Sequence, residues 1–279
     1  MATADLLNFQ NIFSLDGKVA VITGSSKGLG LAAASGMLQA GASRVYITSR
    51  TASACEEACK KLNQLPNKRP GALAIPVPAD SSNFKGIEHL VDAVSQTTDH
   101  VDILLANAGG TQGASIETTT EEEFSQVLGL NLQSVFFLIQ KFLPLLTNRA
   151  TITSTSRIIV TSSVGGLSLS NVGDVATYAY AAAKAGVVHL VKHLAVDLGP
   201  RHILSNCIAP GFFVTEGSAP FLEEYGGKET MAKTYPNGKL GKGEDFAAAA
   251  VFLASRGAAH VNGHCLVIDG GGIVGRIGR

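Results

Sequence analysis

Short runs of apolar residues alternate along this chain with longer segments in which apolar positions recur at helical spacing. The runs that predict strands are Lys18–Thr23, Arg44–Thr48, Ala72–Val77, Ile103–Ala106, Arg157–Thr161, Ile203–Ala209 and Cys265–Ile268. Helices are predicted over Leu29–Ala40, Ala52–Leu65 and Thr177–Leu198. Strands that are apolar throughout need cover on both faces, which indicates a parallel sheet between two layers of helices. Because parallel crossovers are right-handed, the predicted fold is a doubly wound, Rossmann-type α/β domain.

No linker or internal repeat interrupts this alternation, so residues 1–279 are predicted to form a single domain. Glycine and proline gather in Pro66–Gly71 and Gly226–Gly243, which are typical of loops within the pattern. The segment 212–242 lacks clear strand character and follows Pro210-Gly211. A long segment of this kind predicts a mobile lid over a substrate pocket.

Composition and charge exclude several classes of protein. Hydrophobic residues make up 46% of the chain and charged residues 16%, which excludes a disordered or collagen-like protein. Lys+Arg and Asp+Glu number 22 each, so the overall attraction on which binders of nucleic acid and anionic membranes commonly rely is absent. The N-terminus, Met1–Asp5, does not resemble a signal peptide, and no stretch reaches ~18 uninterrupted apolar residues. We therefore expect a soluble, cytoplasmic protein that binds neither nucleic acid nor a membrane.

The cysteines and two of the histidines raise the question of a metal site. Cys55 and Cys59 lie one helical turn apart, but no second Cys/His pair follows at ligand spacing, so helix packing is the better interpretation. His189 and His193 also share a helix face, yet Leu190 stands where a zinc protease motif needs Glu. No metal site is predicted. Four scattered cysteines also argue against a disulfide framework.

A glycine-rich turn joins the first predicted strand to the first predicted helix. Glycines let the backbone approach a pyrophosphate, and a helix N-terminus offers unpaired N–H groups with a partial positive charge. A purely structural turn is the alternative. The predicted dinucleotide-binding residues of this turn are Gly24, Ser26, Lys27, Gly28, Leu29 and Gly30. The spacing, with three residues between the first two glycines, resembles the short-chain dehydrogenase/reductase family, whose members have a single doubly wound domain of this length.

The end of the second predicted strand bears on the choice of dinucleotide. An acidic residue at this position would bind the adenosine ribose hydroxyls of NAD. Here the strand ends Thr48-Ser49-Arg50-Thr51, with no carboxylate. Arg50, with Lys27 from the glycine turn, is placed to contact the 2′-phosphate of NADP(H). Ordinary solvated surface charges are the alternative for both side chains. The predicted cofactor is NADP(H).

Tyr180 and Lys184 match the Tyr-x-x-x-Lys motif of the family. Their i, i+4 spacing places both side chains on one face of a helix. A Tyr hydroxyl is almost fully protonated at neutral pH, and a neighbouring ammonium is expected to lower its pKa so that it exchanges a proton with a substrate oxygen. Tyr178 has Ala182 four residues later and therefore lacks a cationic partner. Tyr180 is the predicted catalytic residue, and Lys184 is also expected to bind the cofactor.

The resemblance implies a catalytic serine after the strand that ends at Thr161. In the family the second serine of such a pair is the usual one, which selects Ser163 and keeps Ser162 in reserve. Ser163 stands further before Tyr180 than in typical members, and an insertion around Ser170–Val175 would explain the difference. Two turn serines without a catalytic role are the alternative.

Several other positions match family motifs in the expected order. Asn131 matches a helix asparagine that links a water to the lysine, and a local structural role is its alternative. The remaining matches are implied to bind the cofactor. Asp80 is implied to lie near the adenine, and the backbone of Asn107, Ala108 and Gly109 to come close to the cofactor. Pro210, Gly211 and Thr215 are implied to contact the nicotinamide. The resemblance covers nearly all the chain, from Asp16 to Gly272.

The family's chemistry implies hydride transfer from NADPH to a ketone or aldehyde, with Tyr180 protonating the oxygen. Within the family the chain looks nearest to 3-oxoacyl thioester reductases of the rhamnolipid-pathway type, on its Tyr178-Ala179-Tyr180 context, its Ile208–Phe212 run and an insert at Asn148–Ser156. An NADP-dependent alcohol dehydrogenase working in the oxidative direction is one alternative. A catalytically silent dinucleotide-binding sensor or scaffold is another, although it would not need both Tyr180 and Lys184.

The expected partners are a small-molecule carbonyl substrate and further copies of the chain. Phe212, Phe213 and Phe221 are expected to line an apolar pocket suited to a hydrophobic, acyl- or polyketide-like substrate. The resemblance implies a homo-oligomer, a tetramer or dimer, assembled through the helices that begin near Glu121 and Thr177. The helix Thr177–Leu198 has more small and apolar surface than one solvated face needs, which agrees with assembly.

Overall fold

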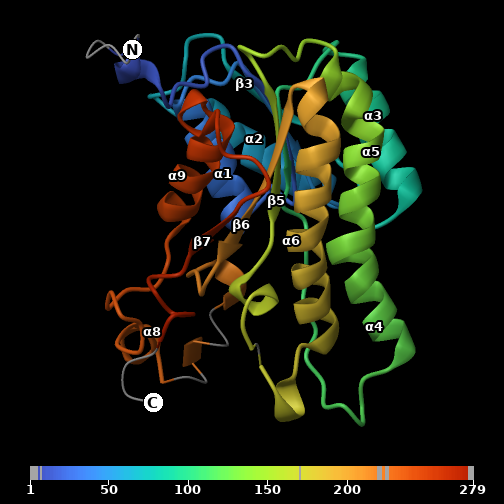
Figure 1. The fold of residues 1–279 in the computed structure, drawn as a ribbon, viewed down its shortest axis with the longest axis vertical. Helices are drawn as coiled ribbons and strands as arrows, with labels where there is room; N and C mark the ends of the chain where they lie inside the picture. Colours follow the sequence, from blue (N-terminus) through green and yellow to red (C-terminus); the bar gives the residue numbers. More distant parts are fainter. Residues whose placement is uncertain (1–5, 7, 170, 219–221, 224–225, 276–279) are drawn as a thin grey trace.

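The computed structural model describes residues 6, 8–169, 171–218, 222–223 and 226–275. Its centre is a sheet of seven parallel strands in the order β3-β2-β1-β4-β5-β6-β7 (Figure 1). The strands are β1 (Val19–Thr23), β2 (Arg44–Thr48), β3 (Leu73–Pro76), β4 (Ile103–Ala106), β5 (Ser156–Thr161), β6 (Ile203–Pro210) and β7 (Cys265–Ile268). Each predicted strand is present, with its ends displaced by at most one residue. The doubly wound α/β architecture is confirmed.

Helices cover both faces of the sheet, as the continuous apolar strands require. One layer consists of α1 (Gly28–Gln39), α2 (Ala52–Asn63) and α9 (Gly243–Ala254). The other consists of α3 (Phe84–Ser95), α4 (Glu121–Leu128), α5 (Ser134–Thr147) and α6 (Tyr178–Leu198) (Figure 1). Alternate residues of a strand point to opposite faces of the sheet. In β1, Ala20 and Ile22 pack in the core beneath α1, α2 and α9, and Val19 and Val21 pack in the core beneath α3, α5 and α6.

The topology also sets the place of the site. Strand order reverses between β1 and β4, and the connections leave this pair in opposite directions, which opens a crevice at their carboxyl ends. The predicted glycine turn follows β1, and Asn107-Ala108-Gly109 follows β4. Both therefore lie at the crevice where open α/β sheets bind their ligands.

The segment 212–242 has a small core of its own. Leu222, Met231, Tyr235 and Leu240 are buried together, with Phe212 packed against them, and a short helix, α8 (Lys228–Ala232), lies between. A bridge between Phe213 and Gly241 closes the segment at its base. Its motion as a lid stays a prediction.

Phe213 packs largely into the core and also contributes to the wall of a cavity of about 530 Å³, so its place in a substrate pocket stays a prediction. Its ring packs almost perpendicular to that of Phe246 in α9, at 6.4 Å between centroids, within the α1–α9 core. The bridge to Gly241 sets this direction for the side chain, and Gly241 itself leaves no room for a Cβ beside the ring. Phe221 and Ser170 lie outside the described residues, as do Met1–Asp5.

Helix packing accounts for the cysteine pair of α2 and for a long apolar helical run. Cys55 and Cys59 are both buried on the inner face of α2, as predicted. The run Glu121–Thr147 is by length and composition apolar enough to cross a membrane, with mean hydropathy 1.3. Its residues Leu138, Phe142 and Leu146 are buried in the α3–α6 core, as in a core helix of a globular protein.

Candidate active site

The glycine turn is shaped for close approach to a ligand. Gly24 adopts φ 63°, and a Cβ added there would stand 2.9 Å from Ala108 Cα. A Cβ on Gly30 would stand 2.4 Å from the Gly24 carbonyl oxygen and 2.6 Å from Asn107 Nδ2. Lys27, the N-cap of α1, is extended and its side chain forms no capping hydrogen bond. The first-turn N–H groups of α1 therefore remain available to an anion, with no side chain in the way.

A cavity of about 240 Å³ gathers most of the predicted cofactor residues. It is lined by Gly24, Ser26, Lys27, Arg50, Asp80, Asn107, Ala108 and Gly109, among others. A second cavity, of about 370 Å³, joins Ser26–Leu29 to Thr215 at the base of the segment 212–242. The methyl group of Thr215 lies 3.9 Å from where a Cβ on Gly28 would stand. Segments far apart in the sequence thus meet around the glycine turn.

Arg50 and Asp80 lie on the same wall of the smaller cavity. Burial alone would raise the pKa of Asp80, but hydrogen bonds from Ser82 and the positive charge of Arg50 hold the pKa of that carboxyl below its usual value. Asp80 is therefore ionised at neutral pH. The Arg50 side chain is exposed, so a phosphate can reach it.

The side chain of Asn107 connects the strand ends at the crevice by hydrogen bonds. Its Nδ2 donates to the carbonyl oxygens of Thr23 and Gly24 at 3.0 and 3.1 Å, and its Oδ1 accepts from Thr161 Oγ1 at 3.1 Å. Thr23 Oγ1 accepts from the backbone N–H groups of Asn107 and Ala108, both at 3.0 Å. These bonds join the ends of β1, β4 and β5. Thr23 and Thr161 were not among the predicted residues, although each is a threonine ending an apolar strand.

Ser163 and Ser162 point to different partners. Ser163 lies close enough to the Tyr180 hydroxyl to lower its pKa by hydrogen bonding, and its Oγ accepts from Gly165 N at 3.1 Å. Ser162 is buried and donates to the carbonyl oxygen of Lys184 at 2.9 Å. The structure therefore brings Ser163 to Tyr180 and uses Ser162 to attach β5 to α6.

Lys184 is buried beneath Tyr180. Its Nζ donates to the Thr161 carbonyl oxygen at 2.7 Å and lies 5.4 Å from the centroid of the Tyr180 ring. Gly166 packs against this turn of α6 so closely that a Cβ would stand 2.5 Å from the Lys184 carbonyl carbon. Tyr180 and Lys184 share one helix face, as their spacing predicts.

The expected lowering of the Tyr180 pKa is wrong. Burial raises the pKa of Tyr180 above its usual value, and the hydrogen bond with Ser163 only partly opposes this. Burial also lowers the pKa of Lys184 to about 8. Both shifts have the same cause, since a low-dielectric interior disfavours the charged form of each group.

Asn131 lies in a single π-helical turn, Gly129–Gln133, between α4 and α5. Its Nδ2 donates to the carbonyl oxygens of Gly110 and Val127 at 2.8 and 2.9 Å, and its Oδ1 accepts from Gly110 N at 3.3 Å. A Cβ on Gly109 would stand 2.7 Å from that Oδ1 and 3.4 Å from Lys184 Nζ. Asn131 thus holds the loop after β4 beside Lys184. Its link to Lys184 through a water stays a prediction.

Pro210 and Gly211 lie at the end of β6, and Gly211 N donates to the Ile268 carbonyl oxygen at 3.1 Å. A Cβ on Gly211 would stand 2.7 Å from Asp269 Cβ, so glycine is required for β6 and β7 to end side by side.

His189 and His193 face each other on α6 at 3.2 Å between Nε2 atoms. Within the described ranges, no group of three or more His, Cys, Asp or Glu side chains is arranged to hold a metal.

Comparison with known proteins agrees with this geometry. A family model described as enoyl-(acyl carrier protein) reductase matches residues 24–272. The rhamnolipids biosynthesis 3-oxoacyl-(acyl-carrier-protein) reductase of Pseudomonas aeruginosa is 36% identical over 259 residues, covering 93% of this chain and 97% of that protein. The solved Pseudomonas aeruginosa RhlG/NADP active-site complex superposes with a TM-score of 0.86 at 35% identity, covering 94% of this chain and 98% of that one.

A second relative has a different substrate in its name. The 5-keto-D-gluconate 5-reductase of Escherichia coli is 31% identical over 264 residues, covering 95% of this chain and 98% of that protein. Matches of this identity and coverage confirm the resemblance inferred from the motifs. The chain belongs to the short-chain dehydrogenase/reductase family of oxidoreductases.

Proposed function

We propose that this protein reduces a ketone or aldehyde to an alcohol with NADPH. The observation that carries the proposal is that Ser163, Tyr180 and the buried Lys184 lie together, at the crevice lined by the glycine turn. The test is oxidation of NADPH by the purified enzyme with a panel of ketones that includes a 3-oxoacyl thioester. Oxidation with none of them would favour the silent sensor, and turnover only of alcohols with NADP would favour the oxidative alternative.

The residues present suit a bound dinucleotide. The backbone cradle at Gly24 and Gly30 is one that any Cβ would fill, and Gly109 leaves space beside Lys184. When bound, NADPH supplies a hydride to the carbonyl carbon. Ser163 donates a hydrogen bond to the carbonyl oxygen and orients it, and the Tyr180 hydroxyl gives its proton to that oxygen as charge develops. Lys184 holds the nicotinamide ribose and stabilises the phenolate that remains, with Asn131 supporting it through water.

The raised pKa of Tyr180 suits the reductive direction. A proton donor must be protonated before the reaction, and a buried phenol with a raised pKa remains so across neutral pH. A charged Lys184 then stabilises the phenolate only as it forms. This supports the proposed acid role of Tyr180 and the proposed reductive direction.

The two serines allow a matched comparison of variants. Ser163→Ala is expected to lower kcat for ketone reduction by about 10²-fold, since a hydrogen bond to the developing oxyanion is lost. Ser162→Ala is expected to cost about 1 kcal/mol of stability, through the lost bond to the Lys184 carbonyl, with a smaller effect on kcat. Steady-state kinetics and thermal denaturation of both variants measure this. A larger kcat loss in Ser162→Ala would transfer the role to Ser162.

The preference for NADPH is assigned to Arg50, assisted by Lys27. Both line the cavity beside the end of β2, and the structural neighbour from Pseudomonas aeruginosa is an NADP complex. Arg50→Ala is expected to raise KM for NADPH about tenfold, with little change in KM for NADH, because only NADPH carries the 2′-phosphate. Arg44, at the opposite end of the same strand, is the control. Equal losses with both cofactors, or an equal effect of Arg44→Ala, would contradict the assignment.

A hydrophobic, acyl- or polyketide-like carbonyl compound is the proposed substrate class. The loop that joins Ser163 to Tyr180 in the chain exposes several large apolar side chains. They are Leu167, Leu169, Val172 and Val175, with Leu169 the most open. An apolar chain that leaves water here gains about 25 cal/mol for each Å² buried. The rhamnolipid-pathway relative, named for a 3-oxoacyl substrate, agrees with this choice.

The protein is further proposed to act in the cytoplasm as a homo-oligomer, a tetramer or dimer. The outer faces of the two helices expected at the interface expose Phe136 on α5 and Val196 on α6. Apolar side chains of this size gain stability when a second copy covers them. Sedimentation velocity of the purified chain tests the assembly.

A further inference from the structure

Arg157 is a buried cation that the proposed reaction does not use. It lies near the start of β5, at the opposite end from Thr161–Ser163, and only 4% of the residue is exposed. Its guanidinium donates to Thr155 and, at 3.1 Å, to the Ser255 carbonyl oxygen. Nε has no partner among the described residues. All its described acceptors are neutral.

A buried guanidinium without an ion pair would be stabilised by a bound anion. Burial lowers the pKa of Arg157 to about 10, so the guanidinium remains charged at neutral pH. Buried charges in proteins are normally paired with an opposite charge, because neutral acceptors replace only part of the lost hydration. In the part of the chain that the structure describes, no carboxylate lies within ion-pair distance of Arg157.

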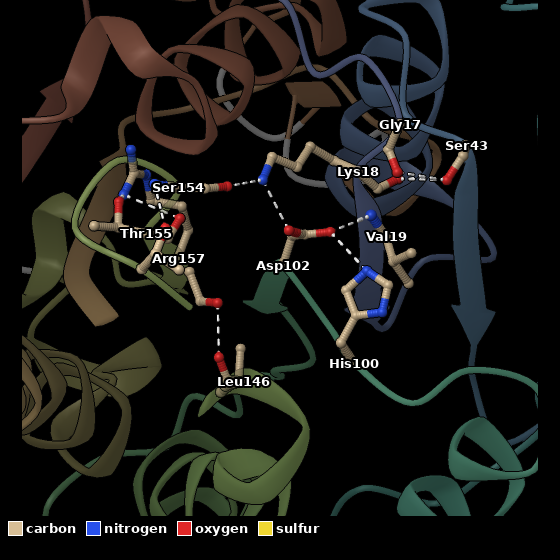
Figure 2. A network of polar contacts seen from close by, with 12 residues as sticks. Gly17, Lys18, Val19, Ser43, His100, Asp102, Leu146, Ser154, Thr155 and Arg157 are labelled. Atoms are coloured by element: carbon tan, nitrogen blue, oxygen red, sulfur yellow. Dashed lines mark hydrogen bonds and ion pairs between the residues drawn. The ribbon is translucent and has the colours of Figure 1, made fainter. Parts of the chain in front are cut away.

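Arg157 forms part of the wall of a cavity of about 1110 Å³ at the amino ends of the strands. Lys18 and Arg256 line the same cavity. Figure 2 shows Lys18 bridging Asp102 and Ser154, both at 2.8 Å, while Arg157 bonds to Thr155. Lys18 is therefore neutralised by Asp102, whereas Arg256 donates to the Asn8 carbonyl oxygen at 3.0 Å and has no described carboxylate partner.

The charge that remains on the wall is positive. Asp16, the acidic residue of the lining, already pairs with Arg69 at 3.0 Å. Arg157 donates to Ser255, the neighbour of Arg256, so the two unpaired guanidinium side chains come from adjoining parts of the wall. Apolar groups complete it: Phe9 is 56% exposed and Ile152 80% exposed.

We propose that this cavity is a second binding site, for an organic carboxylate with an apolar body. The carboxylate compensates Arg157 and Arg256, and the apolar body covers Phe9 and Ile152. Phosphate or another small inorganic anion would satisfy the charges but would leave the apolar wall in water. The site lies at the opposite end of the strands from the glycine turn, and its lining includes none of the residues assigned to the proposed reaction.

Octanoate, titrated calorimetrically into the whole protein, tests the site. We expect saturable binding of one octanoate per chain. Arg256→Gln and Ile152→Asp are both at exposed positions. Arg256→Gln is expected to raise the Kd about fivefold, the upper end for loss of one surface ion pair. Ile152→Asp is expected to raise the Kd by about as much, because it removes apolar contact and places a second negative charge beside the carboxylate. Arg201→Gln is the control, because Arg201 is also an exposed arginine at the amino edge but does not line the cavity. Its Kd should match that of the unchanged protein. Circular dichroism of each variant verifies the fold.

Three results would overturn the proposal. Absence of saturable octanoate binding is the first. The second is binding that Arg256→Gln and Ile152→Asp leave unchanged, which would place octanoate elsewhere, for example at the catalytic crevice. The third is inorganic phosphate binding as tightly as octanoate, because the apolar wall would then contribute nothing.

Discussion

Replacing Tyr180 by Phe is expected to lower kcat for ketone reduction by about 10²- to 10⁴-fold, the usual contribution of a positioned general acid. The variant removes only the hydroxyl, so the ring remains packed above Lys184. Cofactor affinity should change little, because the glycine turn and Arg50 are untouched. Stopped-flow measurement of hydride transfer, with a separate titration of NADPH binding, distinguishes a loss of chemistry from a loss of binding.

Tyr178 is the matched control within the same helix turn. It is 40% exposed, and Ala182 rather than a lysine lies four residues later. Tyr178→Phe is expected to change kcat by no more than about twofold, as for an ordinary surface substitution. Similar losses in the two variants, or an active Tyr180→Phe enzyme, would remove the acid role from Tyr180.

Lys184→Met is expected to make the protein more stable and much less active. At neutral pH the folded protein holds a charged ammonium in the interior, and the fall of its pKa from 10.5 to about 8 measures that cost. Methionine fills similar space without the charge, although the bond to the Thr161 carbonyl oxygen is lost. The expected gain is about 1–2 kcal/mol. kcat/KM should fall by about 10²-fold, because the phenolate of Tyr180 loses its neighbouring cation.

The pH dependence of unfolding gives this prediction a second measurement. Between pH of about 8 and 10.5 the unfolded chain keeps its Lys184 proton while the folded protein has released it. Raising pH through this window therefore favours the folded state, and below about pH 8 the full penalty applies. Urea denaturation at pH 7 and pH 10 should show the difference between variant and unchanged protein shrinking as pH rises. A variant that is less stable at pH 7 would contradict the account.

Local patterns were enough to predict the elements that position the site. All seven strands and the helices α1, α2 and α6 follow from runs of contiguous residues, because apolar periodicity is a property of neighbours along the chain. The shared face of Tyr180 and Lys184 also follows from spacing on one helix. The glycine turn belongs to this group, since the strand before it and the helix after it can both be read from the sequence.

Contacts between distant segments could not be predicted in this way. Asn107 joins the ends of three strands, and Ser162 and Ser163 take different partners although they are adjacent in the sequence. The direction of a side chain after a strand depends on the neighbouring strand and helix, which spacing does not reveal. Phe213 shows the same limit, since its contact with Phe246 of α9 and its bridge to Gly241 both join segments that are far apart in the sequence.

By itself the sequence determined a doubly wound domain, a glycine turn for a dinucleotide and the helix face that carries Tyr180 and Lys184. Only the tertiary structure decided which serine lies beside Tyr180. It also decided that burial raises the pKa of Tyr180 and lowers the pKa of Lys184, which favours the neutral form of each. The tertiary structure also decided that Arg157 is buried and that no carboxylate of the described residues lies within ion-pair distance of it. The physical reason is that periodicity is encoded between near neighbours, whereas hydration and charge pairing depend on every segment packed around a group.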